Sequence, residues 1–235
     1  MASDLALLPS PIGIEVLDDP GADPVLVRRM LGEIATANRL FGGVRALRRG
    51  LRTLFDAPDR GRSVSLLDIG TGAGDLPHAA SRWATAHGLH LAAFGLERHP
   101  TAARLATTAG IPTLLGCGGT LPLRSASIDV VLLSQLLHHL DDTGATRMLA
   151  EAHRVARRGV LVLDLRPSRL AALGFRAAAT AMGFHRSTID DGVVSLARGR
   201  TAAALADLAR SAGARAPHAV ALPFARVLVS WRTDR

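Results

Sequence analysis

The chain has 235 residues, of which 48% are hydrophobic and 20% are charged. This composition is typical of a folded globular domain and excludes an intrinsically disordered chain. The formal charge of +8 comes from arginine alone, because the sequence contains no lysine, and the arginines are spread along the chain. A nucleic-acid surface gathers its charge on one element and interleaves aromatic residues, which amount to only 3% here. The composition therefore disfavours nucleic acid as a partner.

The only cysteine is Cys117, which excludes an internal disulfide and a multi-cysteine metal centre, and we predict no metal site. The opening residues MASDLALLPSPIG have no basic segment, and their apolar run is too short for a secretory signal. No stretch reaches the roughly 20 apolar residues that cross a bilayer. We expect a cytoplasmic protein with no membrane span, and the oligomeric state stays open.

Apolar residues recur every three or four positions between Pro24 and Leu54, which predicts two amphipathic helices joined at NRLFGG. We assign residues 1–60 to an N-terminal helical lid. After a polar linker, short apolar runs alternate with helical stretches. The predicted strands are residues 64–69, 89–96, 111–115, 128–134, 159–165, 216–222 and 224–231. The predicted helices are residues 76–87, 101–109, 142–157, 168–182 and 201–212.

Strands that are apolar on both faces and separated by helices indicate a parallel sheet that is covered on both sides. The last two strands are joined so tightly, through Leu222 and Pro223, that they must be antiparallel. The expected fold class is α/β, a doubly wound and mostly parallel sheet over residues 61–235.

The stretch DIGTGAGD follows the first strand of this sheet, where the ligand crevice of an open parallel sheet lies. Gly70, Gly72 and Gly74 would let the backbone turn tightly and approach a ligand. A dinucleotide site needs the spacing G-x-G-x-x-G, and its pyrophosphate would be repelled by Asp68 and Asp75. These acids instead suit a cationic ligand, and S-adenosylmethionine carries both a sulfonium and an ammonium group.

Glu97 ends the second predicted strand, at the distance from the glycine loop where an acid can accept the hydroxyls of a ribose. It supports a nucleoside without choosing between adenine-containing cofactors. The alternative is that the glycine turn merely connects a strand to a helix. The apolar strand before the loop, the two aspartates and Glu97 together favour the cofactor hypothesis.

With these residues placed, the chain resembles the class I S-adenosylmethionine-dependent methyltransferases from about Ser63 to its C-terminus. The resemblance rests on LLDIGTGAGD, Glu97 and IDVVLLSQLLHHL. It implies a seven-stranded sheet in the order 3-2-1-4-5-7-6 with the last strand antiparallel. A less specific resemblance, to a bacterial group of small-molecule methyltransferases of which some lie beside polyketide-synthase genes, rests on ANRLFGG, LLHHLDD, HRVARRGVLVLDLRPSRLA and DDGVVSLARGRT.

The resemblance implies a set of cofactor-binding residues: Asp68, Gly70, Thr71, Gly72, Gly74, Asp75, Glu97, Arg98, Cys117, Gly118, Ser134 and Gln135. One member departs from the family pattern, in which an acid after the third strand takes the amine of adenine. Cys117 stands there, and a thiol is a weak acceptor. The backbone of Cys117 and Gly118 would then hold adenine, and we expect the thiol itself to be a small buried hydrophobe.

Three residues at strand ends are catalytic candidates. His138 and His139 follow the fourth strand, and a neutral imidazole can act as a general base near pH 7. We expect only one of them to face the pocket; alternatively, the pair caps the helix that begins at Asp141 and Asp142. Asp164, at the end of the fifth strand, would accept a proton or orient a substrate hydroxyl, or else pair with a neighbouring arginine, Arg166 or Arg169.

The substrate candidates lie in two other segments. Asn38 and Arg39 would close over the site from the N-terminal helices, or simply cap and solvate a helix. Asp191, Ser195 and Arg198 lie in an insertion before the last helix and would line the acceptor pocket, or only fix that loop.

We predict a methyltransferase that acts on a small-molecule acceptor, an aromatic or polyketide-like hydroxyl. The alternatives are a carbon methyltransferase of the quinone-ring type, a cofactor-binding protein without catalysis, and an RNA-binding methyltransferase. No NPPY-like or DPPY-like segment follows the fourth strand, and no Pro-Cys dipeptide is present. Both absences count against a nucleic-acid substrate.

Overall fold

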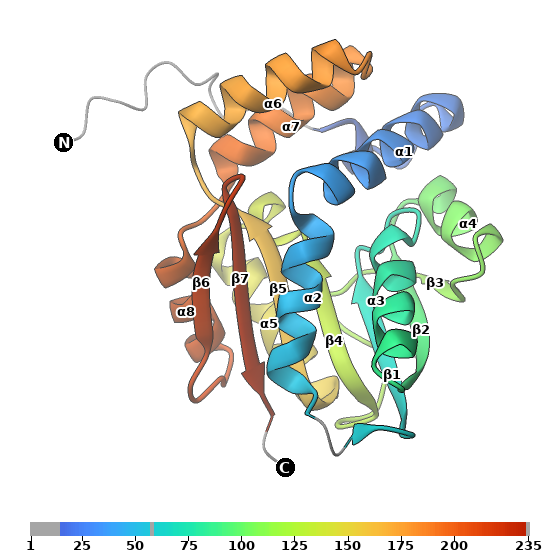
Figure 1. Ribbon diagram of the computed structural model, residues 1–235, viewed down its shortest axis with the longest axis vertical. Coiled ribbons are helices and arrows are strands. Elements are labelled where there is room, and N and C mark those ends of the chain that lie inside the picture. The colour runs from blue at the N-terminus through green and yellow to red at the C-terminus, as the bar shows by residue number, and fades with distance from the viewer. Residues whose placement is uncertain (1–14, 57–58, 234–235) are drawn as a thin grey trace.

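A computed structural model describes residues 15–56 and 59–233. Its centre is one seven-stranded sheet in the order β3-β2-β1-β4-β5-β7-β6, with helices on both faces (Figure 1). The strands are β1 (Ser63–Ile69), β2 (His90–Glu97), β3 (Thr113–Leu115), β4 (Ile128–Ser134), β5 (Ala156–Leu165), β6 (His218–Leu222) and β7 (Arg226–Arg232). Strands β1 to β5 pair in parallel, whereas β7 is antiparallel to both β5 and β6. The predicted fold class, strand order and C-terminal hairpin are confirmed.

The helices are α1 (Pro24–Leu40), α2 (Gly43–Leu54), α3 (Asp75–Ala86), α4 (Pro100–Thr108), α5 (Asp142–Val155), α6 (Arg169–Ala181), α7 (Arg186–Arg198) and α8 (Ala202–Ser211). Two short 3-10 turns matter below, η1 (Val16–Asp18) and η3 (Leu137–His139). The sequence interpretation treats the α7 segment as a loop, and this is wrong. Ile189, Val193 and Leu196 recur at helical spacing and are buried, and the side chain of His185 caps the first turn.

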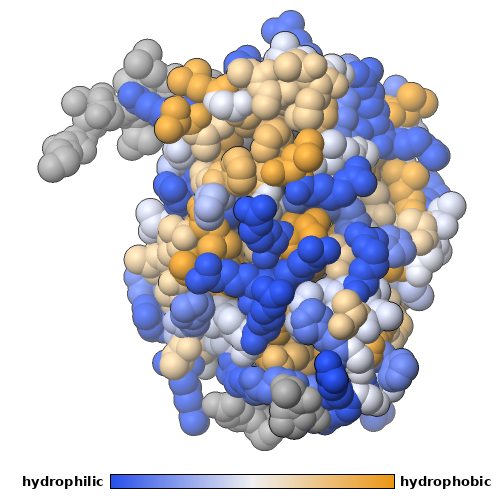
Figure 2. Space-filling model, viewed as in Figure 1, coloured by the Kyte–Doolittle hydropathy of each residue, from blue (hydrophilic) through white to orange (hydrophobic). Residues whose placement is uncertain are grey.

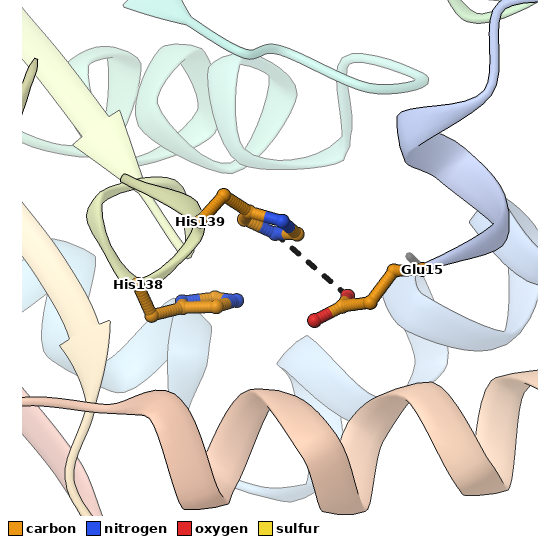
Figure 3. A group of neighbouring side chains, drawn as sticks. All are labelled: Glu15, His138 and His139. Atoms are coloured by element: carbon orange, nitrogen blue, oxygen red, sulfur yellow. Dashed lines mark ion pairs between the residues drawn. The ribbon is translucent and has the colours of Figure 1, made fainter. Parts of the chain in front are cut away.

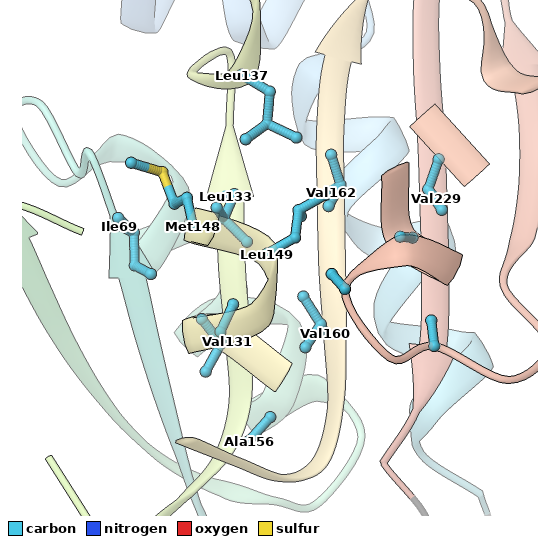
Figure 4. Close-up of a cluster of buried hydrophobic side chains, with 14 of the residues drawn as sticks. Ile69, Val131, Leu133, Leu137, Met148, Leu149, Ala156, Val160, Val162 and Val229 are labelled. Atoms are coloured by element: carbon cyan, nitrogen blue, oxygen red, sulfur yellow. The ribbon is translucent and has the colours of Figure 1, made fainter. Parts of the chain in front are cut away.

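The sheet has a hydrophobic core on each face, which explains why the strands are unbroken apolar runs in the sequence. Along β4, Val130 and Leu132 join the cluster beneath α2 and α3, while Val131 and Leu133 join the cluster beneath α5 and α8. Figure 4 shows the second cluster, in which Met148 and Leu149 of α5 pack on the sheet. Successive side chains of a strand point to opposite faces, so a strand buried on both sides shows no polar alternation.

The two N-terminal helices occupy different places. Helix α2 packs flat on the sheet, and its side chains Leu47, Leu51 and Leu54 are at most 1% exposed. Helix α1 instead lies across the end of the sheet, where Val27 and Leu31 pack against α4 (Figure 1). Within residues 15–60, α1 therefore holds the position of a lid, and α2 is part of the core.

Among the described residues, no helix is long and apolar enough to cross a membrane. The expectation that MASDLALLPSPIG carries no targeting signal concerns residues outside the described ranges.

Candidate active site

A cavity of about 860 Å³ lies at the carboxyl ends of the parallel strands, beneath α1, α6 and α7. It gathers most of the predicted site residues: Asn38, Asp68, Gly70, Thr71, Gly72, Asp75, Glu97, Arg98, Cys117, Gly118, Ser134, Gln135, His138, His139, Asp191 and Ser195. Four predicted residues do not line it, namely Arg39, Gly74, Asp164 and Arg198.

The glycine loop forms one wall of the cavity and has the backbone that the sequence predicts. Gly70, Gly72 and Gly74 have φ values of +74°, +56° and +82°, which L side chains rarely adopt. The N–H of Gly72 donates to Oε2 of Glu97 at 2.9 Å, and the N–H of His99 donates to Oε1 at 2.9 Å. Each carboxylate oxygen keeps a second acceptor position, so Glu97 is held in place and can still accept ribose hydroxyls.

Two acids beside this loop, the buried Asp68 and the half-buried Asp75, form no ion pair with a cation among the described residues. Asp68 is 2% exposed, and its Oδ1 has no hydrogen-bond partner among the described residues. Burial raises the pKa of Asp68 well above its ordinary value, and the charges of Asp75 and Glu97 add to the effect. Burial also raises the pKa of Asp75, although Nδ2 of Asn38 donates to its carboxylate at 3.0 Å. A cationic ligand would relieve both acids.

At the ends of the neighbouring strands β4 and β5, a buried histidine is bonded to a buried aspartate. Nδ1 of His138 lies 2.7 Å from Oδ1 of Asp164, and each side chain is 2% exposed. Burial works to raise the pKa of Asp164, but His138 and the backbone N–H groups of Leu137 and Leu165 outweigh it and hold that pKa below its ordinary value. An ionised carboxylate only accepts, so Nδ1 of His138 carries the proton of this bond, and in a neutral imidazole the lone pair is then on Nε2. The partner of Asp164 is thus a histidine, and neither Arg166 nor Arg169.

His139 also lines the cavity, so the expectation that only one histidine would face it is wrong. The two residues sit in one tight 3-10 turn, and their ring centroids are 4.3 Å apart (Figure 3). Nδ1 of His139 lies 3.2 Å from Oδ2 of Asp18, and its Nε2 lies 3.7 Å from Oε2 of Glu15. Burial opposes the charged imidazole, but these acids prevail and raise the pKa of His139. Helix α5 is capped by Asp141 rather than by the histidine pair.

Of the two residues expected to close over the site from α1, only one reaches it. Asn38 is 2% exposed, and its Oδ1 accepts from Nε2 of Gln135 at 2.9 Å and from Nη2 of Arg226 at 3.2 Å. It thereby ties α1 to the end of β4 and to β7. Arg39 is exposed and bonds to Thr36, because one step along a helix turns a side chain about 100° away from its neighbour.

The three substrate candidates on α7 all hold the segment around η1. Oδ2 of Asp191 accepts from the N–H of Val16 at 2.9 Å, and the hydroxyl of Ser195 donates to Glu15 at 3.0 Å. Nη1 of Arg198 lies 3.3 Å from Glu15. Burial raises the pKa of Asp191 to about 6, and nearby acids such as Glu15 contribute. Asp191 and Ser195 also line the cavity.

Cys117 is exposed, so the expectation of a small buried hydrophobe is wrong. It follows β3 at the edge of the sheet and lines the cavity there. Gly118 is buried beside it, and a Cβ there would come within 2.5 Å of Ile69. Arg98 lines the cavity and forms a 2.8 Å pair with Asp18.

Several polar cavity residues were not predicted from the sequence, among them Glu15, Asp18 and Arg226. Glu15 and Asp18 lie outside any periodic segment, so no local pattern distinguishes them. Arg226 is 5% exposed, its Nη1 has no partner among the described residues, and burial lowers its pKa to about 10. The sequence did carry a sign of Arg226, because an arginine inside the apolar strand FARVLVSW indicates a buried charge that needs polar partners.

The comparison with protein families finds one match, over the central part of the chain. The methyltransferase-domain family matches residues 67–163, which run from β1 through the glycine loop, Glu97 and His138 to β5. This match, together with the fold, supports a class I S-adenosylmethionine-dependent methyltransferase. The methyltransferase family uses S-adenosylmethionine, and solved neighbours hold it or its demethylated product. No curated protein matches its sequence.

Solved structures share the fold of the methyltransferase. Human N-acetylserotonin methyltransferase in complex with S-adenosylmethionine is 17% identical, with a TM-score of 0.61 over 94% of this chain and 58% of that one. A methyltransferase from Aquifex aeolicus is 15% identical, with a TM-score of 0.60 over 90% and 98% of the two chains. A Nostoc punctiforme protein assigned as an O-methyltransferase is 18% identical, with a TM-score of 0.59 over 89% of this chain. The methyltransferase spans about 60% of the Nostoc chain.

The cavity residues fit S-adenosylmethionine. Asp68 offers a buried oxygen without a partner among the described residues, which suits the ammonium or sulfonium charge, and Glu97 offers fixed acceptors for the ribose. The positive-φ glycines leave no Cβ between the loop backbone and the ligand.

Cofactor binding should release protons. Asp68 and Asp75 have raised pKa values, so at mildly acid pH they hold protons that a bound cation displaces. We expect affinity for S-adenosylmethionine to rise as pH rises from about 5 to 8, because only the ionised acids attract the cation. Calorimetry in two buffers of different ionisation enthalpy measures the release. Asp68→Asn should reduce it, and Asp207→Asn, at an exposed carboxylate on α8, should not. Binding with no proton release in the unmodified enzyme would contradict the assignment.

Proposed function

We propose that the methyltransferase methylates a hydroxyl group of a small aromatic or apolar molecule, with His138 as the general base. The observation that carries the proposal is the buried His138–Asp164 pair, whose 2.7 Å bond fixes the imidazole with its free nitrogen at the cavity wall. Nε2 of His138 has no partner among the described residues, so a substrate hydroxyl would be its first.

S-adenosylmethionine supplies an electrophilic methyl group on a sulfonium. Asp68, Asp75 and Glu97 would hold the cofactor on one side of the cavity, and the α7 side would hold the acceptor. Nε2 of His138 would take the hydroxyl proton of the acceptor as its oxygen is methylated, and the sulfonium would supply the methyl group and keep the electron pair of the C–S bond. Asp164 stabilises the imidazolium that results, because its pKa is already low.

The acceptor side of the cavity is aromatic. Phe41, Phe175 and Phe224 all line it, and Phe41 lies 5.9 Å from Phe175 in an edge-to-face contact and 6.0 Å from Phe224. In Figure 2, apolar side chains gather over α6, and Leu170, which also lines the cavity, is 82% exposed there. An aromatic or apolar acceptor would gain both burial and ring contacts along this route.

We further propose that η1 and α1 act as the lid. The pairs that join η1 to the rest of the site cross the cavity rim: Glu15 with Ser195 and Arg198, and Asp18 with Arg98 and His139. Closure by this segment would exclude water from the methyl transfer. The boundary near residue 60 then separates the lid from the cofactor-binding domain. Helix α2 is the exception, because it precedes the boundary but packs in the core of that domain.

The test is transfer of a labelled methyl group from S-adenosylmethionine to host small-molecule fractions, followed by mass spectrometry of the product. We expect a labelled aromatic methyl ether. A methyl group on ring carbon would favour the quinone-ring alternative, and cofactor binding without transfer to any fraction would favour a non-catalytic protein. Transfer to RNA with a steep salt dependence would overturn the small-molecule acceptor.

A further inference from the structure

Three polar side chains converge at the floor of the acceptor side. Glu15, His138 and His139 each direct one ligand-type atom to a common point, and these atoms all lie within 4.8 Å of one another. Figure 3 shows Nε2 of both histidines facing the Glu15 carboxylate. Nε2 of His138 is buried at the cavity wall with no partner among the described residues. An unpartnered buried nitrogen beside a second imidazole calls for a ligand.

Each of the two imidazoles is oriented from behind by a second contact. Asp164 holds Nδ1 of His138 at 2.7 Å, and Asp18 holds Nδ1 of His139 at 3.2 Å. A carboxylate on the far nitrogen of a histidine fixes the tautomer that leaves Nε2 able to bind a metal, and this arrangement is common behind metal-ligating histidines. Neither the turn at η3 nor the capping of α5 requires two such pairs in adjacent residues.

Glu15 is prepared in the same way. Its Oε1 accepts from the hydroxyl of Ser195 at 3.0 Å and lies 3.3 Å from Nη1 of Arg198, while Oε2 lies 3.7 Å from Nε2 of His139. The hydroxyl of Ser195 also lies 3.1 Å from Oε2, so both carboxylate oxygens are held in place, and Oε2 is the one that faces His139. Arg198 places a positive charge near Glu15, His138 and His139, which disfavours a cation there. The negative charges of Asp18 and Asp164, which contact the two histidines, offset it.

We propose that Glu15, His138 and His139 bind one divalent transition-metal ion of the Zn²⁺ class, which receives the oxygen atoms of the acceptor. Imidazole nitrogen with one carboxylate is a donor set that suits such ions rather than Mg²⁺ or Ca²⁺. Metal bonds of about 2.0–2.1 Å bring tetrahedral ligand atoms to about 3.4 Å from one another. The present spread of up to 4.8 Å therefore closes by small side-chain rotations. The prediction that the chain has no metal site is revised accordingly.

Three protein ligands leave coordination positions open toward the cavity, as in catalytic rather than structural metal sites. The inference rests on the proposed function and narrows it to acceptors with an oxygen pair that can chelate, such as neighbouring ring hydroxyls. Bound to the ion, an acceptor hydroxyl loses its proton to water more readily, because the dication lowers the hydroxyl pKa. The ion would thus take over the task that Nε2 of His138 performs in its absence.

The experiment uses the full-length, untagged enzyme, stripped with EDTA and titrated with Co²⁺ and then with Zn²⁺. Co²⁺ bound by imidazole and carboxylate gives a visible absorption band, and calorimetry gives the number of ions per chain. We expect one ion per chain. Glu15→Gln and His139→Gln should each weaken binding by at least about tenfold, and Asp164→Asn by about 10-fold to 100-fold through the loss of orientation. His90→Gln, an exposed histidine at the start of β2, should bind as the unmodified enzyme does.

Affinity for S-adenosylmethionine, measured on the same samples, reports whether each variant is folded. No stoichiometric ion in the unmodified enzyme, or unchanged ion affinity in folded Glu15→Gln, would overturn the metal site. Unimpaired methyl transfer to a hydroxyl by the stripped enzyme would overturn the ion's role and leave the proposed function intact. If the enzyme binds one ion but transfers no methyl group to any hydroxyl, the proposed function is overturned and the metal site stands.

Discussion

Replacing His138 with glutamine should lower kcat for methyl transfer by about 10²-fold to 10⁴-fold, the usual contribution of a positioned general base. Glutamine nearly fills the imidazole volume and can still bond to Asp164, but it cannot take a proton. The affinity for S-adenosylmethionine should change little, because Asp68, Asp75 and Glu97, and not His138, are the proposed cofactor contacts. Steady-state kinetics with the labelled product gives kcat, and calorimetry gives the affinity.

Two companion variants sharpen this test. Asp164→Asn keeps the side-chain shape but removes the acceptor that holds Nδ1–H of His138, so the ring loses its fixed tautomer and kcat should fall by a similar factor. His90→Gln changes an exposed histidine outside the cavity lining and should leave kcat unchanged. A His138→Gln enzyme whose kcat stays within about threefold of normal would remove His138 from the chemistry.

Periodicity alone predicted the sheet well, because its signals are local. A strand such as β4, with Val131 and Leu133 on one face and Val130 and Leu132 on the other, is apolar throughout and cannot be mistaken for a surface strand. The strand order came from family resemblance, since spacing does not say which strands pair. Helix α7 was not predicted, although Ile189, Val193 and Leu196 have helical spacing.

The site divides in the same way. His138 and Asp164 are 26 residues apart, yet they follow neighbouring strands β4 and β5, so topology alone brings them together. Asp18 lies 121 residues from His139, and only the packing of the N-terminal segment on α7 makes them neighbours. A pattern search sees residues that share an element or a strand end. It does not see a cluster assembled by tertiary packing, and for that reason the three-residue ligand group escaped it.

Gly72→Val should weaken binding of S-adenosylmethionine by at least about 100-fold, which corresponds to about 2.7 kcal/mol. Gly72 has a φ of +56°, where a side chain costs about 1–2 kcal/mol, and a β-branched one suffers most. A Cβ there would also lie 3.2 Å from Leu31 of α1. Any relaxation of the loop would move the Gly72 N–H away from Glu97, which releases the carboxylate that is placed for the ribose. Calorimetry with the purified variant gives the affinity.

The matched control separates backbone strain from the cofactor site. Gly110 has a φ of +90°, no described atom within 4 Å of the point where a Cβ would lie, and no place in the cavity lining. Gly110→Val should therefore lower the free energy of unfolding by about 1–2 kcal/mol, the same backbone strain that Gly72→Val introduces. It should leave the affinity for the cofactor unchanged. If both valine variants lose stability but bind S-adenosylmethionine normally, the glycine loop does not hold the cofactor. If only Gly72→Val loses affinity, the loss arises at the loop itself, because the strain is common to both.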